Sequence, residues 1–380
     1  MSVTTKSNVI FPSWILIVMA MQSLLWGVTA QAQIWREAPA GVEDDTAEYW
    51  TPERLQRAKP IDLPRAAESL GTESLAVPVQ GESISRPGSG PSIEVEPDNT
   101  QLFVPIDHSK HDGATKMMPQ SSGTAQAYFT SSRVIPAPKA QTSYPFRPTG
   151  KLFFHDASSD AEGECSAAVI RPRLVITAGH CVYDAEKKLW YEKFQFQPAH
   201  HNGRTRYGRW NWQWVITTSS WTNDDGVPPN SADFALLEMR DDAKGRKIGN
   251  ITGYYGWRTN ALYPNHVTML GYPVDFDSGS WMHRVDSHSF ERDPVNNTVT
   301  YGSDMGSGSS GGPWLENFGE ISAGQTVTPS GMNYVVGVTS YGVGDPLRYQ
   351  GASILNDEFT NNSKTGILDI ACTHRAGNCE

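Results

Sequence analysis

A serine in a glycine-rich stretch is the first residue of this chain that could carry chemistry. Ser310 lies within residues 306–313, Gly-Ser-Gly-Ser-Ser-Gly-Gly-Pro. Glycine permits unusual backbone dihedrals, so such a loop can expose one hydroxyl and aim several backbone N–H groups at one point. A flexible Gly/Ser linker is the alternative, but Pro313 and Trp314 lead straight into a core-like segment. A serine hydroxyl is a poor nucleophile unless a base removes its proton, so the chain must also supply that base.

A histidine upstream can be that base. His180 follows the β-branched run 174–177 and two small residues, which predicts a strand that ends in a tight turn with the histidine on it. Histidine can take and return a proton near neutral pH. Cys165 can form a disulfide with Cys181 and hold that turn, and closing such a loop contributes roughly 3 kcal/mol in the chain-entropy model.

An aspartate is needed to hold the imidazole in one tautomer. Asp233 directly precedes the apolar run 234–237, where a carboxylate is costly unless it is paired. Asp224 and Asp225 are the competing candidates, but they lie in a polar turn, which favours a solvated position or a weak cation site. The three candidates therefore follow the order histidine, aspartate, serine along the chain.

The segments around these residues have the pattern of an all-β protein. From residue 144 onward, short apolar runs recur between clusters of turn residues, which predicts many short strands packed as a sandwich or a barrel. A helix is expected only near the end, around residues 356–362. The apolar runs are 152–154, 167–170, 174–177, 212–216, 234–237, 267–270, 299–301 and 334–338.

Composition narrows the classes of function. The chain has 380 residues, with 31 Lys and Arg against 41 Asp and Glu, which gives a net charge of −10. An acidic chain without a basic stripe is a poor candidate for nucleic-acid binding. The four cysteines suit two disulfides in an oxidising compartment, and the second pair, Cys372 and Cys379, would close a small C-terminal loop.

The N-terminus has the features of a secretory signal peptide. Lys6 is the only charged residue before the apolar run 10–28, and Ala-Gln-Ala at 30–32 offers small residues where a signal peptidase reads them. An uncleaved membrane anchor is the alternative, because the run is long for a signal core. We interpret residues 1–32 as a cleaved signal peptide. The mature protein is then expected to be secreted, extracellular or periplasmic, monomeric and without stable membrane association.

The three motifs together resemble a known family. Thr-Ala-Gly-His-Cys at 177–181, Asp233 before its apolar strand and Gly-Ser-Ser-Gly-Gly-Pro at 308–313 resemble, in that order, the trypsin/chymotrypsin-like serine endopeptidases. The closer likeness is to their bacterial secreted branch, the V8-like or glutamyl-endopeptidase-like group, and it covers about residues 140–365. That closer likeness rests on residues 144–146, 150–154, 196–199, 270–273 and 280–282.

The resemblance implies a fold and a set of roles. The fold would be two antiparallel six-stranded β-barrels with the site in the cleft between them, followed here by the short C-terminal helix. His180 would be the general base, Asp233 its orienter and Ser310 the nucleophile that forms an acyl-enzyme. The backbone N–H groups of Gly308 and Ser310 would form the oxyanion hole, in which one donor is typically worth about 3–4 kcal/mol.

The resemblance also implies a substrate pocket. Ser340, Tyr341 and Gly342 look like the strand that pairs with the substrate backbone and forms one wall of the primary pocket. Asp304 lies six residues before the nucleophile, where trypsin holds its pocket carboxylate, and this favours Lys or Arg before the cut; a solvent-facing loop residue is the alternative. Glutamate-specific relatives have a histidine shortly before the aromatic-Gly pair, and this chain has Thr339 and Ser340 there.

Residues 33–133 read as a separate region, rich in Pro, Glu, Ser and Gly and without cysteine. In a secreted hydrolase such an extension indicates a propeptide, here largely irregular, ahead of a protease domain at 134–380; a disordered spacer is the alternative. Thr51 and Pro52 could cap and start one short helix. A cut after Arg133 would expose an N-terminus like the family's. Ser309 replaces the Asp by which trypsin-like zymogens capture that new N-terminus, so activation would work otherwise, for example by unblocking the cleft.

Other classes of function fit less well. Residues 308–312 also match the Gly-x-Ser-x-Gly elbow of lipases, but that elbow leads into a helix and needs Asp and His after the serine, and only His374 follows. A pseudoprotease that binds partners is the non-enzyme alternative, although no catalytic group is missing. His200 and His201 are adjacent and face opposite ways in a strand, so they make a poor zinc pair. We expect protein or peptide substrates, no metal and no cofactor.

Overall fold

The computed structural model describes residues 33–39, 42–65, 81–98, 127–223, 226–319, 332–343 and 348–380, together with Met1. From Gln33 onward these residues belong to one compact unit. Apart from Met1, the predicted signal peptide lies outside the described residues, as do the competing carboxylates Asp224 and Asp225. No helix in the described ranges is long and apolar enough to cross a membrane.

The first sheet closes into a six-stranded antiparallel barrel. Its strand order is β11-β10-β5-β6-β7-β12, and β12 returns to pair with β11. Leu152, Phe194 and Leu236 are fully buried in its core. The strands are β5 (Thr149–Asp156), β6 (Ala161–Val169), β7 (Leu174–Thr177), β10 (Glu192–Pro198), β11 (Trp210–Thr217) and β12 (Ala235–Met239).

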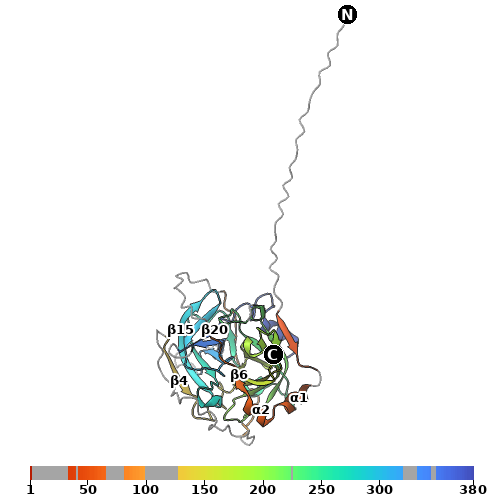
Figure 1. The fold of residues 1–380 in the computed structure, drawn as a ribbon, viewed down its shortest axis with the longest axis vertical. Helices are drawn as coiled ribbons and strands as arrows, with labels where there is room; N and C mark the ends of the chain where they lie inside the picture. Colours follow the sequence, from red (N-terminus) through yellow and green to blue (C-terminus); the bar gives the residue numbers. More distant parts are fainter. Residues whose placement is uncertain are drawn as a thin grey trace. The chain divides into compact units, whose positions relative to one another are not determined.

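A second sheet follows along the chain, and Figure 1 marks it by β15 and β20 beside the first barrel with β6. Its order is β19-β20-β16-β15-β14-β17-β18-β13, and among the described strands this path does not close on itself. Met269, Tyr301 and Trp314 fill its core. The strands are β13 (Gly256–Arg258), β14 (His266–Gly271), β15 (His283–Asp293), β16 (Thr298–Gly302), β17 (Pro313–Glu316), β18 (Tyr334–Val338), β19 (Tyr341–Val343) and β20 (Tyr349–Ser353).

The connections between these strands hold short elements. A small hairpin joins β8 to β9, and two short helices follow β11 and β12. One 3-10 turn, η2, lies directly after β7 and carries the predicted base. These elements are η2 (Gly179–Cys181), β8 (Tyr183–Asp184), β9 (Leu189–Trp190), α3 (Ser219–Asn223), α4 (Ile248–Thr252) and η3 (Asp277–Gly279).

The described parts of the extension pair with both sheets. β1 runs antiparallel to β11, β2 parallel to β6, β3 antiparallel to β13 and β4 antiparallel to β15. The expected cap of α2 is present, because Oγ1 of Thr51 accepts a 3.3 Å hydrogen bond from the N–H of Arg54. The elements are β1 (Ile34–Glu37), α1 (Val42–Tyr49), α2 (Pro52–Arg57), β2 (Lys59–Pro60), β3 (Ser85–Arg86) and β4 (Phe129–Arg133).

The predicted domain boundary falls at the end of β4. Arg133 pairs with His283 in the sheet, and its guanidinium binds Asp277 and lies over the ring of Trp281. The next residue, Val134, is buried and donates its N–H to the Met282 carbonyl at 2.9 Å. A protease that cuts after Arg133 must therefore first release this strand from the sheet.

The C-terminal helix, α5, spans Ile367–His374 and not the expected 356–362, which forms turns. The side-chain oxygens of Asn356 and Asn361 accept hydrogen bonds from nearby backbone N–H groups, at 3.0 Å from Glu358 and 3.2 Å from Thr365. Such local bonds compete with a helix.

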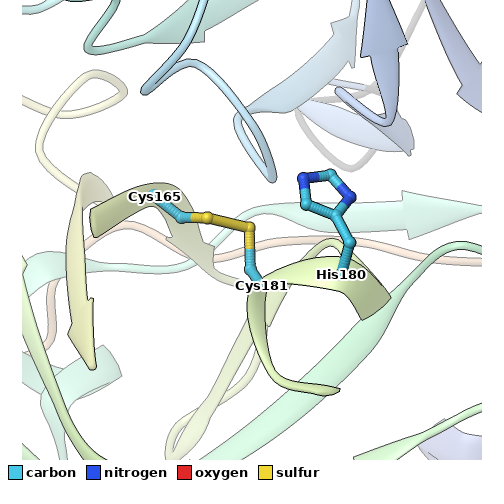
Figure 2. A group of neighbouring side chains, drawn as sticks. All are labelled: Cys165, His180 and Cys181. Carbon is cyan, nitrogen blue, oxygen red and sulfur yellow. A yellow bond between two sulfur atoms is a disulfide. The ribbon is translucent and has the colours of Figure 1, made fainter. Parts of the chain in front are cut away.

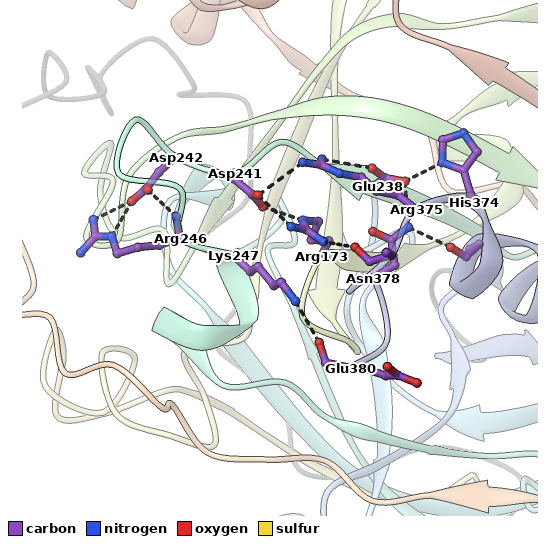
Figure 3. A network of polar contacts seen from close by, with 12 residues as sticks. Arg173, Glu238, Asp241, Asp242, Arg246, Lys247, His374, Arg375, Asn378 and Glu380 are labelled. Carbon is purple, nitrogen blue, oxygen red and sulfur yellow. Dashed lines mark hydrogen bonds and ion pairs between the residues drawn. The ribbon is translucent and has the colours of Figure 1, made fainter.

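A polar network ties the C-terminal segment to the first barrel (Figure 3). Glu238 of β12 is fully buried, and its carboxylate binds Nδ1 of His374 at 2.7 Å and Nδ2 of Asn378 at 2.8 Å. Arg173 binds Asp241 through two hydrogen bonds of 2.6 and 2.8 Å. A buried carboxylate requires such partners, so this segment is an integral part of the barrel.

Candidate active site

His180 and Asp233 lie together in the interior. Asp233 precedes β12 and is fully buried, and His180 lies on η2 with 6% of its surface exposed. Oδ2 of Asp233 lies 2.8 Å from Nδ1 of His180, and Oδ1 accepts a 2.9 Å hydrogen bond from the N–H of His180. With Nδ1 donating to the carboxylate, Nε2 is the nitrogen that can accept a proton.

The same carboxylate also contacts the second sheet. The hydroxyl of Ser340 donates a 2.5 Å hydrogen bond to Oδ2 of Asp233, and the backbone N–H of Asp233 donates to Oγ of Ser353 at 3.0 Å. Several hydrogen bonds to a buried carboxylate offset the cost of removing it from water. The aspartate is therefore held in place from both sheets.

A disulfide fixes the turn that carries the histidine. It joins Cys165 of β6 to Cys181 of η2, and Figure 2 shows it beside the His180 ring. Among the described residues, Cys165, His180 and Cys181 also have possible metal-ligand atoms within 4.8 Å of one another. Both sulfurs are consumed by the disulfide, so they offer no thiolate to a metal. The second disulfide joins Cys372 to Cys379.

The loop before β17 brings Ser310 to the end of β7. A Cβ at Gly311, whose φ is +76°, would lie only 2.0 Å from Oγ1 of Thr177, so only glycine fits this close approach. The N–H of Gly311 donates to the Thr339 carbonyl at 2.8 Å, and the Ser310 carbonyl accepts from the N–H of Ser166 at 2.8 Å. These bonds place Ser310 between the two sheets, beside the turn of His180 and next to Ser340.

Two backbone N–H groups of this loop are available to a ligand. Among the described residues, neither Gly308 nor Ser310 donates its N–H to an acceptor. The carbonyl of Ser307 accepts from Val274 at 2.9 Å and that of Ser309 from Gly312 at 2.9 Å. Because a trans peptide directs its N–H opposite to its carbonyl, both free N–H groups point away from these internal partners. Two such donors could bind a developing negative charge on an oxygen.

The hydroxyl of Ser310 and the imidazole of His180 are not hydrogen-bonded to each other. Within the described chain, neither Nε2 of His180 nor Oγ of Ser310 has a hydrogen-bond partner, and both atoms are buried. Ser310 has no exposed surface at all. The structure therefore joins His180 to Asp233, while the hydroxyl of Ser310 makes no hydrogen bond to Nε2 of that histidine.

The predicted pocket residues have different surroundings. Asp304 is half-buried ahead of the serine loop, and Ser340 binds Asp233 as described. Tyr341 is buried, donates to Oγ1 of Thr298 at 3.2 Å, and its pKa is raised by burial. Its ring lies against β20, where a Cβ at Gly351 would meet it at 2.0 Å. Gly342 is next in the chain, and its N–H donates to the carbonyl of Pro64 at 3.0 Å.

A second carboxylate near Asp304 was not expected from the sequence. Asp275 accepts a hydrogen bond from the N–H of Gly306, and a Cβ at Gly306 would lie 1.8 Å from its Oδ2. Burial raises the pKa of Asp275, and the charge of Asp304 raises it further. Asp275 comes from the loop after β14, far from Asp304 in sequence, so only the folded chain reveals the pair.

The chain is similar to known proteases. The family model described as Trypsin matches residues 151–355. An extracellular metalloprotease of Bacillus subtilis is 26% identical over 224 residues, 58% of this chain and 64% of the relative. A glutamyl endopeptidase of Bacillus licheniformis is 30% identical over 145 residues, 37% of this chain and 41% of the relative. The chain thus spans less than two thirds of either relative.

The chain is also similar to solved protease structures. The protease Anisep from Arthrobacter nicotinovorans has a TM-score of 0.47 at 25% identity, with 56% of this chain and 92% of that chain covered. A Glu endopeptidase in complex with MPD has a TM-score of 0.47 at 21% identity, with 60% and 92% covered.

Proposed function

The chain belongs to the trypsin family of serine endopeptidases, and from that premise we propose that Ser310, His180 and Asp233 form its catalytic triad. The observation that carries this proposal is the 2.8 Å contact between Nδ1 of His180 and the buried Oδ2 of Asp233. It leaves Nε2 as the proton acceptor on the side of the ring away from the carboxylate. A carboxylate in this position orients the imidazole and stabilises its protonated form.

The reaction follows from these positions. Oγ of Ser310 attacks the carbonyl carbon of the substrate while Nε2 of His180 takes the hydroxyl proton. The N–H groups of Gly308 and Ser310 stabilise the oxyanion, and His180 then gives its proton to the leaving amine. Water, activated by the same histidine, hydrolyses the acyl-enzyme and restores the serine.

The pocket favours a positively charged side chain before the cut. The residues of the substrate that precede the cut would lie along Ser340, Tyr341 and Gly342, with that side chain directed toward Asp304. The position of Asp275 supports this assignment, because its Oδ2 lies against Gly306, two residues after Asp304 at the front of the serine loop. Two such groups attract Lys or Arg and repel Glu. No metal or other cofactor enters the reaction as proposed.

The protein is further proposed to be a secreted, monomeric enzyme made as a precursor. The name of the Bacillus subtilis relative, an extracellular protease, supports secretion. Its proposed parts are a signal peptide at 1–32, a propeptide at 33–133 and a protease domain at 134–380.

A peptide library tests the proposed function. The processed protein is incubated with proteome-derived peptides, and the residue before each cut is read by mass spectrometry. Enrichment of Lys and Arg, lost in Ser310→Ala, is expected. Enrichment of Glu or of apolar residues would remove the role given to Asp304, and cutting that persists in Ser310→Ala would remove the triad.

A further inference from the structure

The segment that follows α2 crosses from one side of the candidate site to the other. It starts at the edge of the first barrel, where Lys59 and Pro60 of β2 run parallel to Gly163 and Glu164 of β6. The N–H of Ile61 then donates to the Glu164 carbonyl at 3.3 Å. Glu164 directly precedes Cys165, the disulfide partner of the turn with His180, so this contact lies at one rim of the site.

The next contacts are made with the loop of the nucleophile. The N–H of Leu63 donates to Oγ of Ser307 at 3.2 Å. A Cβ at Gly308, one of the two oxyanion donors, would lie 3.5 Å from Cβ of Pro60. The segment therefore covers the residues that must approach the carbonyl of a substrate.

The last contacts are made with β19, the strand that would pair with the backbone of a substrate. The N–H of Gly342 donates to the carbonyl of Pro64 at 3.0 Å. The side chain of Leu63 lies directly on the same glycine, since a Cβ at Gly342 would be 2.3 Å from its Cδ2. Gly342 cannot offer this N–H and this surface to a substrate while Leu63 and Pro64 occupy them.

Burial within the segment matches this placement. Pro60, Ile61, Leu63 and Pro64 are half-buried, while Lys59, Asp62 and Arg65 are exposed. In the structure that holds this segment beside the serine loop, Ser310 has no exposed surface, and the side chain of His180 is 6% exposed. A nucleophile with no exposed surface cannot meet a polypeptide substrate.

The structure assigns residues Lys59 to Pro64 as a built-in inhibitor that occupies the substrate cleft in the direction opposite to a substrate, an inference that rests on the proposed function. In the proposed function, residues of a substrate before the cut lie along 340–342. Those after it continue past Ser310 to the side of β6, because the Ser310 carbonyl accepts from the N–H of Ser166 on that strand, two residues from Glu164. The segment meets Glu164 first and Gly342 last, so it runs the other way.

The reversed direction explains how the protease can hold a peptide in its own cleft without cutting it. Hydrolysis needs one carbonyl with its oxygen at the N–H groups of Gly308 and Ser310 and its carbon at Oγ of Ser310. A reversed chain presents its carbonyls and N–H groups in the opposite order, so we expect none of its peptide bonds to meet both requirements. Pro60 and Pro64 restrict the backbone further and lack an N–H.

The elements before the segment anchor it to the first barrel. Trp50 is 1% exposed and donates its indole N–H to the Lys193 carbonyl at 2.6 Å. Arg57 of α2 binds Glu162 of β6 at 2.8 Å. Tethering holds the inhibitory segment at a high effective concentration above the site.

Fluorophosphonate labelling of the intact precursor tests this assignment. The variant Leu63→Asp removes the apolar contact with Gly342 and places a charge on it, and the matched control Asp62→Ala changes the neighbouring exposed residue. Precursor and variants are followed by intact mass, so processing is seen directly. We expect Leu63→Asp to label at least about tenfold faster than the unmodified precursor, and Asp62→Ala to label at the unmodified rate. Equal rates for Leu63→Asp and the unmodified precursor, both folded by circular dichroism, would overturn the inference.

A synthetic peptide of residues 59–65 gives a second measurement that does not depend on the variant folding. Added to the protein after limited proteolysis of the extension, it should inhibit peptide hydrolysis competitively and remain intact by mass spectrometry. Cleavage of the peptide would overturn the reversed direction, and no inhibition at millimolar peptide would overturn occupancy of the cleft. If the processed protein neither labels at Ser310 nor cuts any peptide, the proposed function itself fails, an outcome distinct from both.

Discussion

Oδ2 of Asp233 receives two hydrogen bonds, one from Nδ1 of His180 at 2.8 Å and one from the hydroxyl of Ser340 at 2.5 Å. The histidine belongs to the first barrel and the serine to the second sheet. The orientation of the base therefore depends on how the two sheets meet, and Ser340 is a positioning residue as well as part of the substrate wall.

Ser340→Ala should lower kcat by about 10- to 100-fold with little change in KM. A hydrogen bond to a charged group is worth about 1.5–3 kcal/mol, and here it steadies the carboxylate that orients the base. Ser340→Thr, which keeps the hydroxyl, should recover most of the rate. Steady-state kinetics on one peptide substrate give the two constants.

Ser353→Ala is the matched control for that change, because Ser353 accepts from the backbone N–H of the same aspartate and not from its carboxylate. It should lower the melting temperature but leave kcat within about threefold. An equal loss of kcat in both variants would assign Ser340 a merely structural role.

Asp304→Asn should lower kcat/KM for Arg-containing peptides by about 30- to 100-fold. Loss of one partly buried charge pair costs about 2–3 kcal/mol of transition-state stabilisation. Asp275→Asn keeps the hydrogen-bonding shape beside Gly306 and should have a smaller effect, since its carboxylate already binds that N–H. Competition between Arg, Glu and Leu peptides in one reaction measures the preference, and an unchanged Arg preference in Asp304→Asn would place the specificity elsewhere.

Removal of either disulfide should destabilise the protein, and the two effects should differ. The sequence separations are 16 for Cys165–Cys181 and 7 for Cys372–Cys379, which correspond to roughly 3 and roughly 2 kcal/mol in the chain-entropy model. Loss of the first should also lower activity, because it frees the turn of His180. Urea unfolding of the two double Ala variants gives the free energies, and a larger loss for the C-terminal pair would contradict the ranking.

Acid should destabilise the protein through His201, and the loss should begin as the pH falls below about 6.5. Burial is the main reason that its pKa is lowered from 6.5 to about 4, and the positive charges of Arg206, Arg204 and Arg133 lower it further. The unfolded chain thus binds a proton below about pH 6.5 that the folded chain refuses until about pH 4. This stability is fully present above pH 6.5 and is lost as the pH falls toward 4.

His201→Gln removes that titration and provides the measurement. Between pH 7.5 and 4.5 the unmodified protein should lose about 2 to 3 kcal/mol through this residue, and the variant should lose correspondingly less. The neighbouring His200, whose pKa burial and Lys151 lower well below 6.5, contributes in the same direction and remains in both proteins. Parallel pH profiles for the two proteins would refute the assignment to His201.

The motifs predicted the family and the closed first barrel because each has a local cause. A β-branched run that ends in small residues before His180, and an apolar strand after Asp233, are visible within a few residues of sequence. The loop of Ser310 could also be predicted from the sequence, since its glycines are needed where the chain passes close to other residues, as Gly311 does to Thr177. Residues whose neighbours fix their conformation can be assigned from a single sequence.

Features that depend on distant contacts could not be predicted. Nothing local marks Asp275 as a neighbour of Asp304. The helix was expected at 356–362 but forms at 367–374, because asparagine side chains at 356 and 361 accept hydrogen bonds from nearby backbone N–H groups. The composition of 33–133 indicated irregular chain, yet its described parts contribute strands to both sheets. For these strands, the pairing partners lie more than a hundred residues away.

The pairing of β1 with β11 and the burial of Trp50 have a consequence for how activity would appear over time. A single cut after Arg65 breaks the chain but not these contacts, so the fragment before the cut remains bound as a separate inhibitor. Release then follows mass action: activity rises on dilution, falls when the fragment is added back, and shows a lag set by the dissociation rate of the fragment and not by the rate of cutting.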